Sequence, residues 1–263
     1  IRRQRQMCIR DRRNTALKCA TGDYIYYVDA DDSIEPHTLE CLVNEINHKG
    51  LDIVGHEWYL TFNSNARYMK QPAYTTSVEA LRKMMGGVMR WNLWLFLVRR
   101  SLYVENDIRF TEGLNMGEDM MVMMKLFICA GKVGIVHRPF YHYRQSNPES
   151  LTKIYSQEHI IQVANNVYEV EKYVNASAYA DSLIEFIPFL KLNIKLPLLI
   201  TDDKSHYEQW LECFPEANCY VMNNKLLPLR TRIIQWMAVK RYFILLRLYY
   251  RTVFKLVYGI IYK

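Results

Sequence analysis

The fold is decided by Tyr24-Ile25-Tyr26-Tyr27-Val28-Asp29-Ala30-Asp31-Asp32, an apolar and aromatic run that ends in three carboxylates. The run follows Gly22 and is rich in residues that favour strands, so it predicts a strand buried on both faces, as in a parallel sheet. Ligands of open α/β sheets bind beyond the carboxyl ends of such strands, where these acids would lie. Carboxylates that lie close together raise one another's pKa, and a divalent cation removes that cost. The residues therefore indicate a site for Mg²⁺ or Mn²⁺ together with a substrate diphosphate.

The residues that follow predict a helix and a second strand. Pro36 suits a helix start, apolar residues then recur at helical spacing, and Gly50 suits the helix end. Residues 51–55 read as the next short strand. The order of strand, acidic loop, helix and strand is a βαβ unit, which predicts the α/β class.

Three other interpretations of the acidic motif stay open at this point. Asp29, Asp31, Ser33 and Glu40 occupy positions 1, 3, 5 and 12 of a calcium-binding EF-hand loop, but Ile34 stands where that loop needs glycine. A strand that ends in Asp-x-Asp also opens the haloacid-dehalogenase-type phosphatases, although the sequence after it matches them poorly. The third interpretation is a solvated acidic turn that caps the next helix.

A longer series of motifs resembles a known family. The series is Arg13-Asn14, Leu17, Ala20, Gly22, Tyr24-Ile25, Asp29-Ala30-Asp31-Asp32, Trp94, Leu97 to Leu102, Ile108-Arg109-Phe110, Gly117-Glu118-Asp119 and Pro139 to Arg144. In this order the motifs resemble family 2 glycosyltransferases with the GT-A fold, over about residues 13–152. The resemblance implies a GT-A-like mixed sheet flanked by helices.

The resemblance also implies a reaction and its residues. Asp119 would be the catalytic base for an acceptor hydroxyl, and direct displacement at the anomeric carbon would invert its configuration. Asp31 and Asp29 would hold a Mg²⁺ or Mn²⁺ ion. The residues implied in donor binding are Arg13, Asn14, Asp29, Asp31 and Arg144, and those implied in acceptor binding are Trp94 and Glu118.

Structural alternatives exist for several of these residues. Glu118 and Asp119 precede an apolar helical pattern, so they could simply complement the positive end of a helix. Arg144 could be a structural arginine. The sequence Leu95-Phe96 after Trp94 departs from the polar residue usual in the family, which puts an acceptor contact there in doubt.

The first twelve residues fit neither the family nor a strand pattern. Residues 1–12 are expected to be a non-native segment that resembles translated adapter sequence, with a basic functional arm as the alternative. The strand and loop that hold the nucleotide base in the family are not found upstream of Arg13. We therefore expect the chain as given to be N-terminally truncated and inactive in transfer by itself.

Charge is concentrated at the two ends of the chain. Of the 34 Lys and Arg residues, nine lie in 217–263 with no acid and six in 1–13 with one acid, which leaves 19 basic and 26 acidic residues in between. This distribution argues against a nucleic-acid-binding surface on the folded domain. Six cysteines without a Cys-x-x-Cys pair favour a reduced compartment over a disulfide framework.

We predict a catalytic domain over residues 13–153, a helical extension over 154–227 with breaks at Pro188, Pro197 and Pro215, and a basic amphipathic helix over 228–263. On that helix Lys240, Arg247, Arg251 and Lys255 would share one face toward anionic lipid, or the helix would instead dock on the domain.

The sequence thus predicts an inverting glycosyltransferase that moves a sugar from a nucleotide-diphospho-sugar to a glycan or lipid-linked acceptor in surface-polysaccharide synthesis. We expect a peripheral position on the cytoplasmic face of the bacterial inner membrane. A metal-dependent phosphatase, or a non-enzymatic membrane- or RNA-binding module, is the alternative. Donor hydrolysis with sugar transfer separates the two enzymes, and salt-sensitive RNA binding by the tail would support the binding module.

Overall fold

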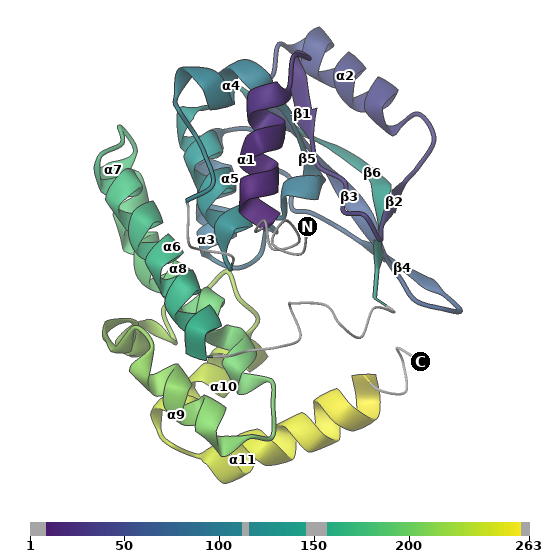
Figure 1. Cartoon of the computed structure of the whole chain (residues 1–263). Helices are drawn as coiled ribbons and strands as arrows, with labels where there is room; N and C mark the ends of the chain where they lie inside the picture. The colour runs from purple at the N-terminus through teal and green to yellow at the C-terminus, as the bar shows by residue number, and fades with distance from the viewer. Residues whose placement is uncertain (1–8, 112–115, 146–156, 259–263) are drawn as a thin grey trace, which may run out of the picture.

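A computed structural model describes residues 9–111, 116–145 and 157–258 of the chain (Figure 1). Within these residues, a six-stranded mixed sheet has the order β1-β5-β3-β6-β2, and β4 pairs with β3. The strands are β1 (Tyr24–Tyr26), β2 (Ser33–Ile34), β3 (Ile53–Thr61), β4 (Ala66–Met69), β5 (Phe96–Arg99) and β6 (Val133–Arg144). The helices around the sheet are α1 (Ile9–Cys19), α2 (Thr38–Lys49), α3 (Ser77–Met85), α4 (Arg100–Glu105) and α5 (Glu118–Cys129), with a 3-10 turn η2 (Leu93–Leu95) before β5. The predicted mixed sheet flanked by helices is confirmed.

The sheet lies between two helical layers because its side chains alternate between faces. Ile53, Phe96 and Val98 join the large core cluster that contains α3 and α5. Val54 and Leu97 join a smaller cluster formed with α2 on the other face. Figure 1 shows α2 on one side of the sheet and α3 and α5 on the other.

Helix α5 is apolar on every side because the sheet covers one of its faces and α6 (Gln157–Asn175) covers another. Met120 to Met124 are all fully buried. This methionine cluster is therefore part of the core, which suits methionine's ability to fill irregular apolar gaps.

Strand β1 differs from the prediction in length, direction and burial. It has three half-buried residues, it pairs antiparallel with β5, and it lies at one end of the strand order of the described residues. The two strands of the predicted βαβ unit, β1 and β3, do run in the same direction, but β5 lies between them and is antiparallel to both. The apolar run therefore marked a strand correctly, whereas continuous apolar character was a poor guide to its neighbours.

Strand β6 carries an irregularity that affects the site. Its parallel register with β3 shifts on both sides of Glu57, and Pro139 lies opposite that residue. A proline inside a strand is tolerated at such a bulge because it has no N–H to contribute to the ladder. Bulges also redirect the side chains that follow them, and here Tyr141 follows two residues after the proline.

The C-terminal part of the described chain is helical, as predicted. Its helices after α6 are α7 (Ala180–Leu183), α8 (Ile187–Lys195), α9 (Lys204–Glu212), α10 (Leu229–Val239) and α11 (Phe243–Tyr249), the last continuing as the π-helix η7 (Tyr250–Tyr258). The 3-10 segments are η4 (Ile184–Phe186), η5 (Leu196–Leu199) and η6 (Pro215–Tyr220). Pro188, Pro197 and Pro215 each lie in the first turn of a new element, where the missing N–H costs nothing.

The predicted basic helix over 228–263 is interrupted. Helix α10 ends at Val239, and Arg241 adopts a left-handed conformation with φ 57° before α11 begins. Lys240 therefore lies on a different helix from Arg247 and Arg251, so a shared basic face is wrong. Arg247 donates a hydrogen bond to the Asp202 carbonyl, and Arg251 forms an ion pair with the Asp202 carboxylate. The side chain of Lys255 lies outside the described residues. In the described part of the chain, no helix has both the length and the apolar character that crossing a bilayer requires.

Residues 9–12, which the sequence analysis set aside, form the first turn of α1. Residues 1–8 lie outside the described part. The two predictions for residues 1–12, a non-native segment and a basic arm, stay predictions.

Candidate active site

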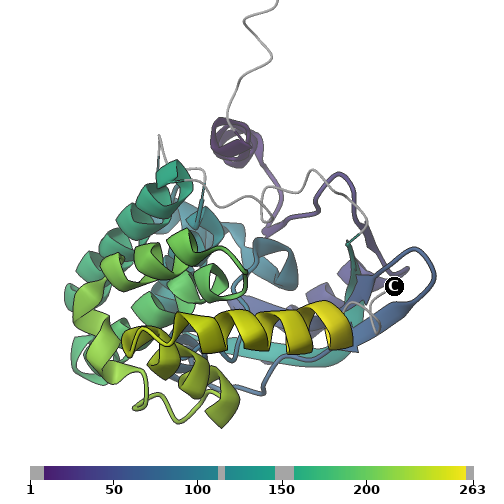
Figure 2. The same cartoon turned by 90° about the horizontal axis from the view of Figure 1, so that it is seen from below.

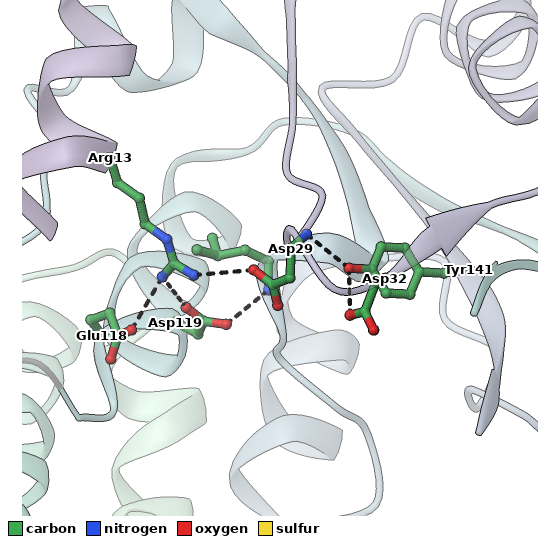
Figure 3. A network of polar contacts seen from close by, with 7 residues as sticks. Arg13, Asp29, Asp32, Glu118, Asp119 and Tyr141 are labelled. Atoms are coloured by element: carbon green, nitrogen blue, oxygen red, sulfur yellow. Dashed lines mark hydrogen bonds and ion pairs between the residues drawn. The ribbon is translucent and has the colours of Figure 1, made fainter. Parts of the chain in front are cut away.

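Arg13 on α1 lies at the centre of a cluster of carboxylates (Figure 3). Its Nη1 donates to Asp119 Oδ1 at 2.7 Å and to Glu118 Oε1 at 3.1 Å, and its Nη2 lies 3.8 Å from Asp29 Oδ1. The guanidinium also lies over the rings of Tyr27 and Phe110. One half-buried cation thus joins acids that are about ninety residues apart in the chain.

The acidic turn after β1 is held from β6 by a single phenol. The Asp29 N–H donates to Tyr141 Oη at 3.0 Å, and that hydroxyl donates to Asp32 Oδ2 at 2.8 Å (Figure 3). The other oxygen of Asp32 accepts the Arg144 N–H at 2.7 Å. Asp32 is therefore engaged in fixing the turn, which leaves Asp31 exposed at its tip.

The electrostatics of the turn favour a cation. Burial raises the pKa of Asp29 to about 6, Arg13 opposes that rise, and the carboxylates of Asp119, Asp32 and Asp31 add to it. The Asp29 side chain is nevertheless 41% exposed, so it can still meet a ligand from solvent. A positive charge placed beside it would offset the repulsion from its neighbours.

Asp119 owes its position to the start of α5. Gly117 precedes the helix with φ 79°, a left-handed conformation that glycine adopts without strain. Asp119 Oδ1 binds Arg13, and its Oδ2 accepts the Leu93 N–H at 3.3 Å. The bonds described for this carboxylate thus run to α1 and to η2, whereas simple helix capping would direct it to N–H groups of its own first turn. Its side chain is 22% exposed.

The other predicted residues are distributed around this cluster. Asn14 exchanges two hydrogen bonds with the Phe110 backbone, at 2.9 and 3.0 Å, and so ties α1 to the segment after α4. The backbone of Arg144 is used by Asp32, and its side chain is exposed beside the turn. Glu118 shares the Arg13 guanidinium with Asp119. The predicted roles of these residues in binding donor or acceptor stay predictions.

Trp94 is buried, with only 4% of its surface exposed. Its ring stacks on Tyr141 with centroids 4.4 Å apart and packs against Tyr143 and Trp58. The indole faces are thus covered by other aromatic rings, which speaks against the predicted stacking on an acceptor sugar. In this structure Trp94 supports the tyrosine that holds the acidic turn.

Asp29 and Asp31 fit a divalent cation as a pair. In the described residues, no three His, Cys, Asp or Glu side chains form a site from protein ligands alone. Mg²⁺ is usually bound through one or two carboxylates together with substrate phosphates, so two acids on one turn suffice for a site completed by a diphosphate. The raised pKa of Asp29 agrees with this assignment.

Sequence reasoning missed the roles of Tyr141 and Asp32. Tyr141 lies within the motif Pro139 to Arg144, but that motif assigned it no role, and nothing in the alternation of β6 distinguishes it from Tyr143. In the sequence, the trace of the bulge is Pro139 inside a strand. That proline could have drawn attention to the residues after it.

The fold as a whole is similar to that of a solved structure. The crystal structure of Staphylococcus aureus TarS 1-349 in complex with UDP-GlcNAc superposes with a TM-score of 0.61 at 18% sequence identity, covering 91% of this chain and 70% of that one. This likeness shows the fold, which is GT-A-like.

The sequence is also similar to known families and proteins. A family model described as Glycosyl transferase family 2 matches residues 1–125. Among curated proteins, an uncharacterized glycosyltransferase EpsJ of Bacillus subtilis is 31% identical over 149 residues, which is 54% of this chain and 43% of the relative. The cholesterol galactosyltransferase of Borreliella burgdorferi is 32% identical over 152 residues, which is 52% of this chain and 42% of the relative. The chain thus matches less than half the length of these relatives.

Proposed function

We propose that this protein transfers a sugar from a nucleotide-diphospho-sugar to a hydroxyl of a glycan or lipid-linked acceptor, with inversion at the anomeric carbon. The observation that carries the proposal is the convergence of Asp29, on the acidic turn, and Asp119, at the start of α5, on one half-buried arginine, Arg13. This geometry brings a candidate donor-binding acid and a candidate base into one site. The UDP-GlcNAc bound in the TarS structure supports a donor of this class.

The chemistry follows from what these side chains can do. Asp119 accepts the proton of the acceptor hydroxyl, and the resulting oxygen nucleophile forms a bond to the anomeric carbon from one face. The bond to the diphosphate oxygen breaks on the opposite face, so a single displacement inverts the configuration. Arg13 and the Leu93 N–H orient the Asp119 carboxylate, which keeps its oxygens aimed at one position.

Asp29 and Asp31 would hold Mg²⁺ or Mn²⁺, which supplies positive charge to the departing diphosphate when it is bound. Tyr141 and Asp32 keep the turn in the conformation that presents these two carboxylates. Arg144, exposed beside the same turn, would add positive charge toward the diphosphate.

The biological setting is also part of the proposal. We infer an acceptor in surface-polysaccharide synthesis and a peripheral position on the cytoplasmic face of a bacterial inner membrane. The relatives that are glycosyltransferases of bacteria support this setting.

The test uses the protein with a family-type N-terminal segment in place of residues 1–12, because the chain as given is expected to be inactive in transfer by itself. Sugar transfer is assayed from UDP-N-acetylglucosamine or UDP-galactose, with Mn²⁺ and a fraction of bacterial lipid-linked glycans, followed by NMR of the product's anomeric proton. We expect an inverted product and loss of activity with chelator or Asp31→Asn. A retained configuration, or full activity of both Asp31→Asn and the chelated enzyme, would contradict the mechanism. Release of phosphate from a monoester without sugar transfer would favour the phosphatase alternative.

A further inference from the structure

An apolar surface on the last two helices has no partner among the described residues. We call it the α10–α11 surface, and it consists of Leu229, Ile233, Trp236, Tyr242, Ile244, Leu245 and Leu248. Ile244 is 84% exposed, Leu229 and Leu248 are each 55% exposed, and even Trp236 is 38% exposed. Contiguous apolar exposure of this kind marks interaction sites, because water-facing helices normally carry polar residues there.

The surface is continuous across the break between the helices. On α10, Leu229, Ile233 and Trp236 recur at spacings of four and three residues, so they share one helical face. On α11, Ile244 and Leu248 are four residues apart. The Trp236 and Tyr242 rings meet edge to face with centroids 5.7 Å apart, which joins the two sets at the corner.

The inward faces of the same helices are already used. Ala238 and Leu246 are almost fully buried and belong to the main core, which fixes the orientation of both helices. Figure 2 shows α11 running along the outside of the molecule, in front of the other helices. The exposed residues are therefore a separate set from those that hold the helices in place.

The charge around the surface is positive. Residues 217–263 contain nine Lys and Arg residues and no Asp or Glu. Arg241 forms an ion pair with Glu208 and Arg251 forms one with Asp202, whereas Arg247 donates to the Asp202 backbone carbonyl. Arg230 and Lys240 are exposed and form no ion pair with any described residue. The surface thus combines apolar side chains with uncompensated positive charge.

We propose that the α10–α11 surface docks on an anionic lipid bilayer, with its apolar side chains in the interface and Arg230 and Lys240 near the headgroups. Apolar residues with cationic neighbours, and amphipathic tryptophan and tyrosine rings, are the features that bind this environment. A second copy of the chain fits less well, because two surfaces that both carry positive charge repel each other. The proposed function includes a peripheral position on the membrane, and the α10–α11 surface is the part of the protein that would make that contact.

The position of the surface agrees with an acceptor in the membrane. Figure 1 shows α11 on the side of the sheet where β6 ends, which is the side that carries Tyr141 and Arg144. Docking through α11 would bring the candidate active site toward the lipid. Only the biological role of the docking, which is to bring the active site to a membrane-bound acceptor, rests on the proposed function. Lipid binding itself requires neither donor nor catalytic base.

The test is co-sedimentation with vesicles of phosphatidylcholine containing phosphatidylglycerol, compared with vesicles of phosphatidylcholine alone. Ile244→Ser combined with Leu248→Ser should lower binding to the mixed vesicles on the order of 100-fold, because two exposed aliphatic side chains no longer enter the interface. Arg230→Gln combined with Lys240→Gln should lower binding to the mixed vesicles roughly 30-fold. Binding to the neutral vesicles should change little in the basic pair.

Matched controls use exposed residues elsewhere. Ile161→Ser on α6, where the side chain is 55% exposed, and Lys132→Gln before β6 should leave vesicle binding unchanged. Unchanged binding by the Ile244 and Leu248 variant, or an equal loss in the controls, would overturn the proposal. So would a monomer–dimer equilibrium in lipid-free solution that the same variant abolishes, because the surface would then be a protein contact.

The outcome is independent of catalysis. Asp119→Asn should bind vesicles as well as the unchanged protein does. If transfer fails with every donor while vesicle binding follows the prediction, the proposed function is wrong and the docking surface is retained. If transfer succeeds and the surface variants bind vesicles normally, the docking surface is wrong and the proposed function is retained.

Discussion

Arg13 and Lys191 each lie between carboxylates, one at the candidate active site and the other in the helical extension. Lys191 binds Glu171 at 2.9 Å and Glu216 at 3.0 Å, and Lys195 one turn later donates to Cys213 O, Phe214 O and Asn218 Oδ1. The two cations there lie among two acids, and each lysine ammonium has at least two oxygen partners. Around Arg13, one cation meets three acids, with two further carboxylates on the same turn.

The difference in balance separates a structural cluster from a functional one. The two lysines of the extension are buried. The Lys191 side chain is 8% exposed, and the residue Lys195 is 2% exposed. The acids of the sheet are partly open and carry an excess of negative charge, which folding stability alone does not require. Because the carboxylates outnumber Arg13, a further positive charge beside them would lower their mutual repulsion.

The largest expected effect is on Asp119. Asp119→Asn keeps the shape of the side chain and removes the proton acceptor, so kcat should fall about 10²-fold or more. The enzyme's steady-state transfer rate measures this. Glu118→Gln is the matched control, since it lies on the same helical turn and shares Arg13, and it should cost much less. Equal and mild losses in both variants would mean that the acids only complement the helix end.

The next effect is on Lys195 and concerns stability. Lys195→Met removes the charged donor to Cys213 O and Asn218 Oδ1, whereas Phe214 O keeps the Ala217 N–H, so the free energy of unfolding should fall by about 2–4 kcal/mol. Urea unfolding followed by circular dichroism measures it. The catalytic rate below the melting range should stay the same, and a large loss of kcat in the folded variant would break the distinction between the two clusters.

The same variant carries a pH signature. Burial lowers the pKa of Lys195 to about 8, with opposing effects of Cys213 and Glu216. The unfolded chain keeps this proton up to a pH of about 10.4. Between pH 8 and 10 the unfolded state therefore binds more protons, so this lysine's contribution to stability becomes more favourable as pH rises. The stability gap between the wild-type protein and Lys195→Met should accordingly be wider at pH 10 than at pH 7, and an equal gap at both would contradict the assignment.

The smallest effect is on Tyr141. Tyr141→Phe keeps the stack on Trp94 but removes the hydroxyl that binds the Asp29 N–H and Asp32. The acidic turn should become less ordered, and the Mn²⁺ concentration for half-maximal transfer should rise on the order of tenfold. Tyr143→Phe is the control on the same strand and should change this concentration little. An unchanged Mn²⁺ requirement in Tyr141→Phe would show that the turn holds its shape without the phenol.

The sequence was sufficient for several local elements and for singling out acids that the structure brings close together. The spacing around Gly50 and Gly117 predicted α2 and the start of α5, because helix ends depend on nearby residues. Asp29 and Asp119 were identified through motifs, and the structure brings them to one arginine. Helix ends and short acidic motifs can be predicted from one sequence because they depend on residues that are close together in the chain.

The tertiary partners could not be read in the same way. Arg13 pairs with acids more than a hundred residues away, and only the fold determines that they meet. The buried position of Trp94 depends on the bulge in β6, and the break at Arg241 depends on a left-handed residue other than glycine or asparagine. These features arise from packing between distant segments, so spacing along the chain contains little trace of them.

The long separations within the polar network have a consequence for how the protein forms. The bonds from Arg13 to Glu118, from Arg13 to Asp119 and from Asp29 to Tyr141 span 105, 106 and 112 residues. Closing loops of that length costs entropy before any contact repays it, so such pairings form late in folding. On a ribosome, the network cannot assemble until the chain has been synthesised past β6. If the protein binds a nucleotide-sugar through this network, only molecules in which these distant segments have come together can bind it. Donor binding would then measure the fraction of molecules that have finished folding.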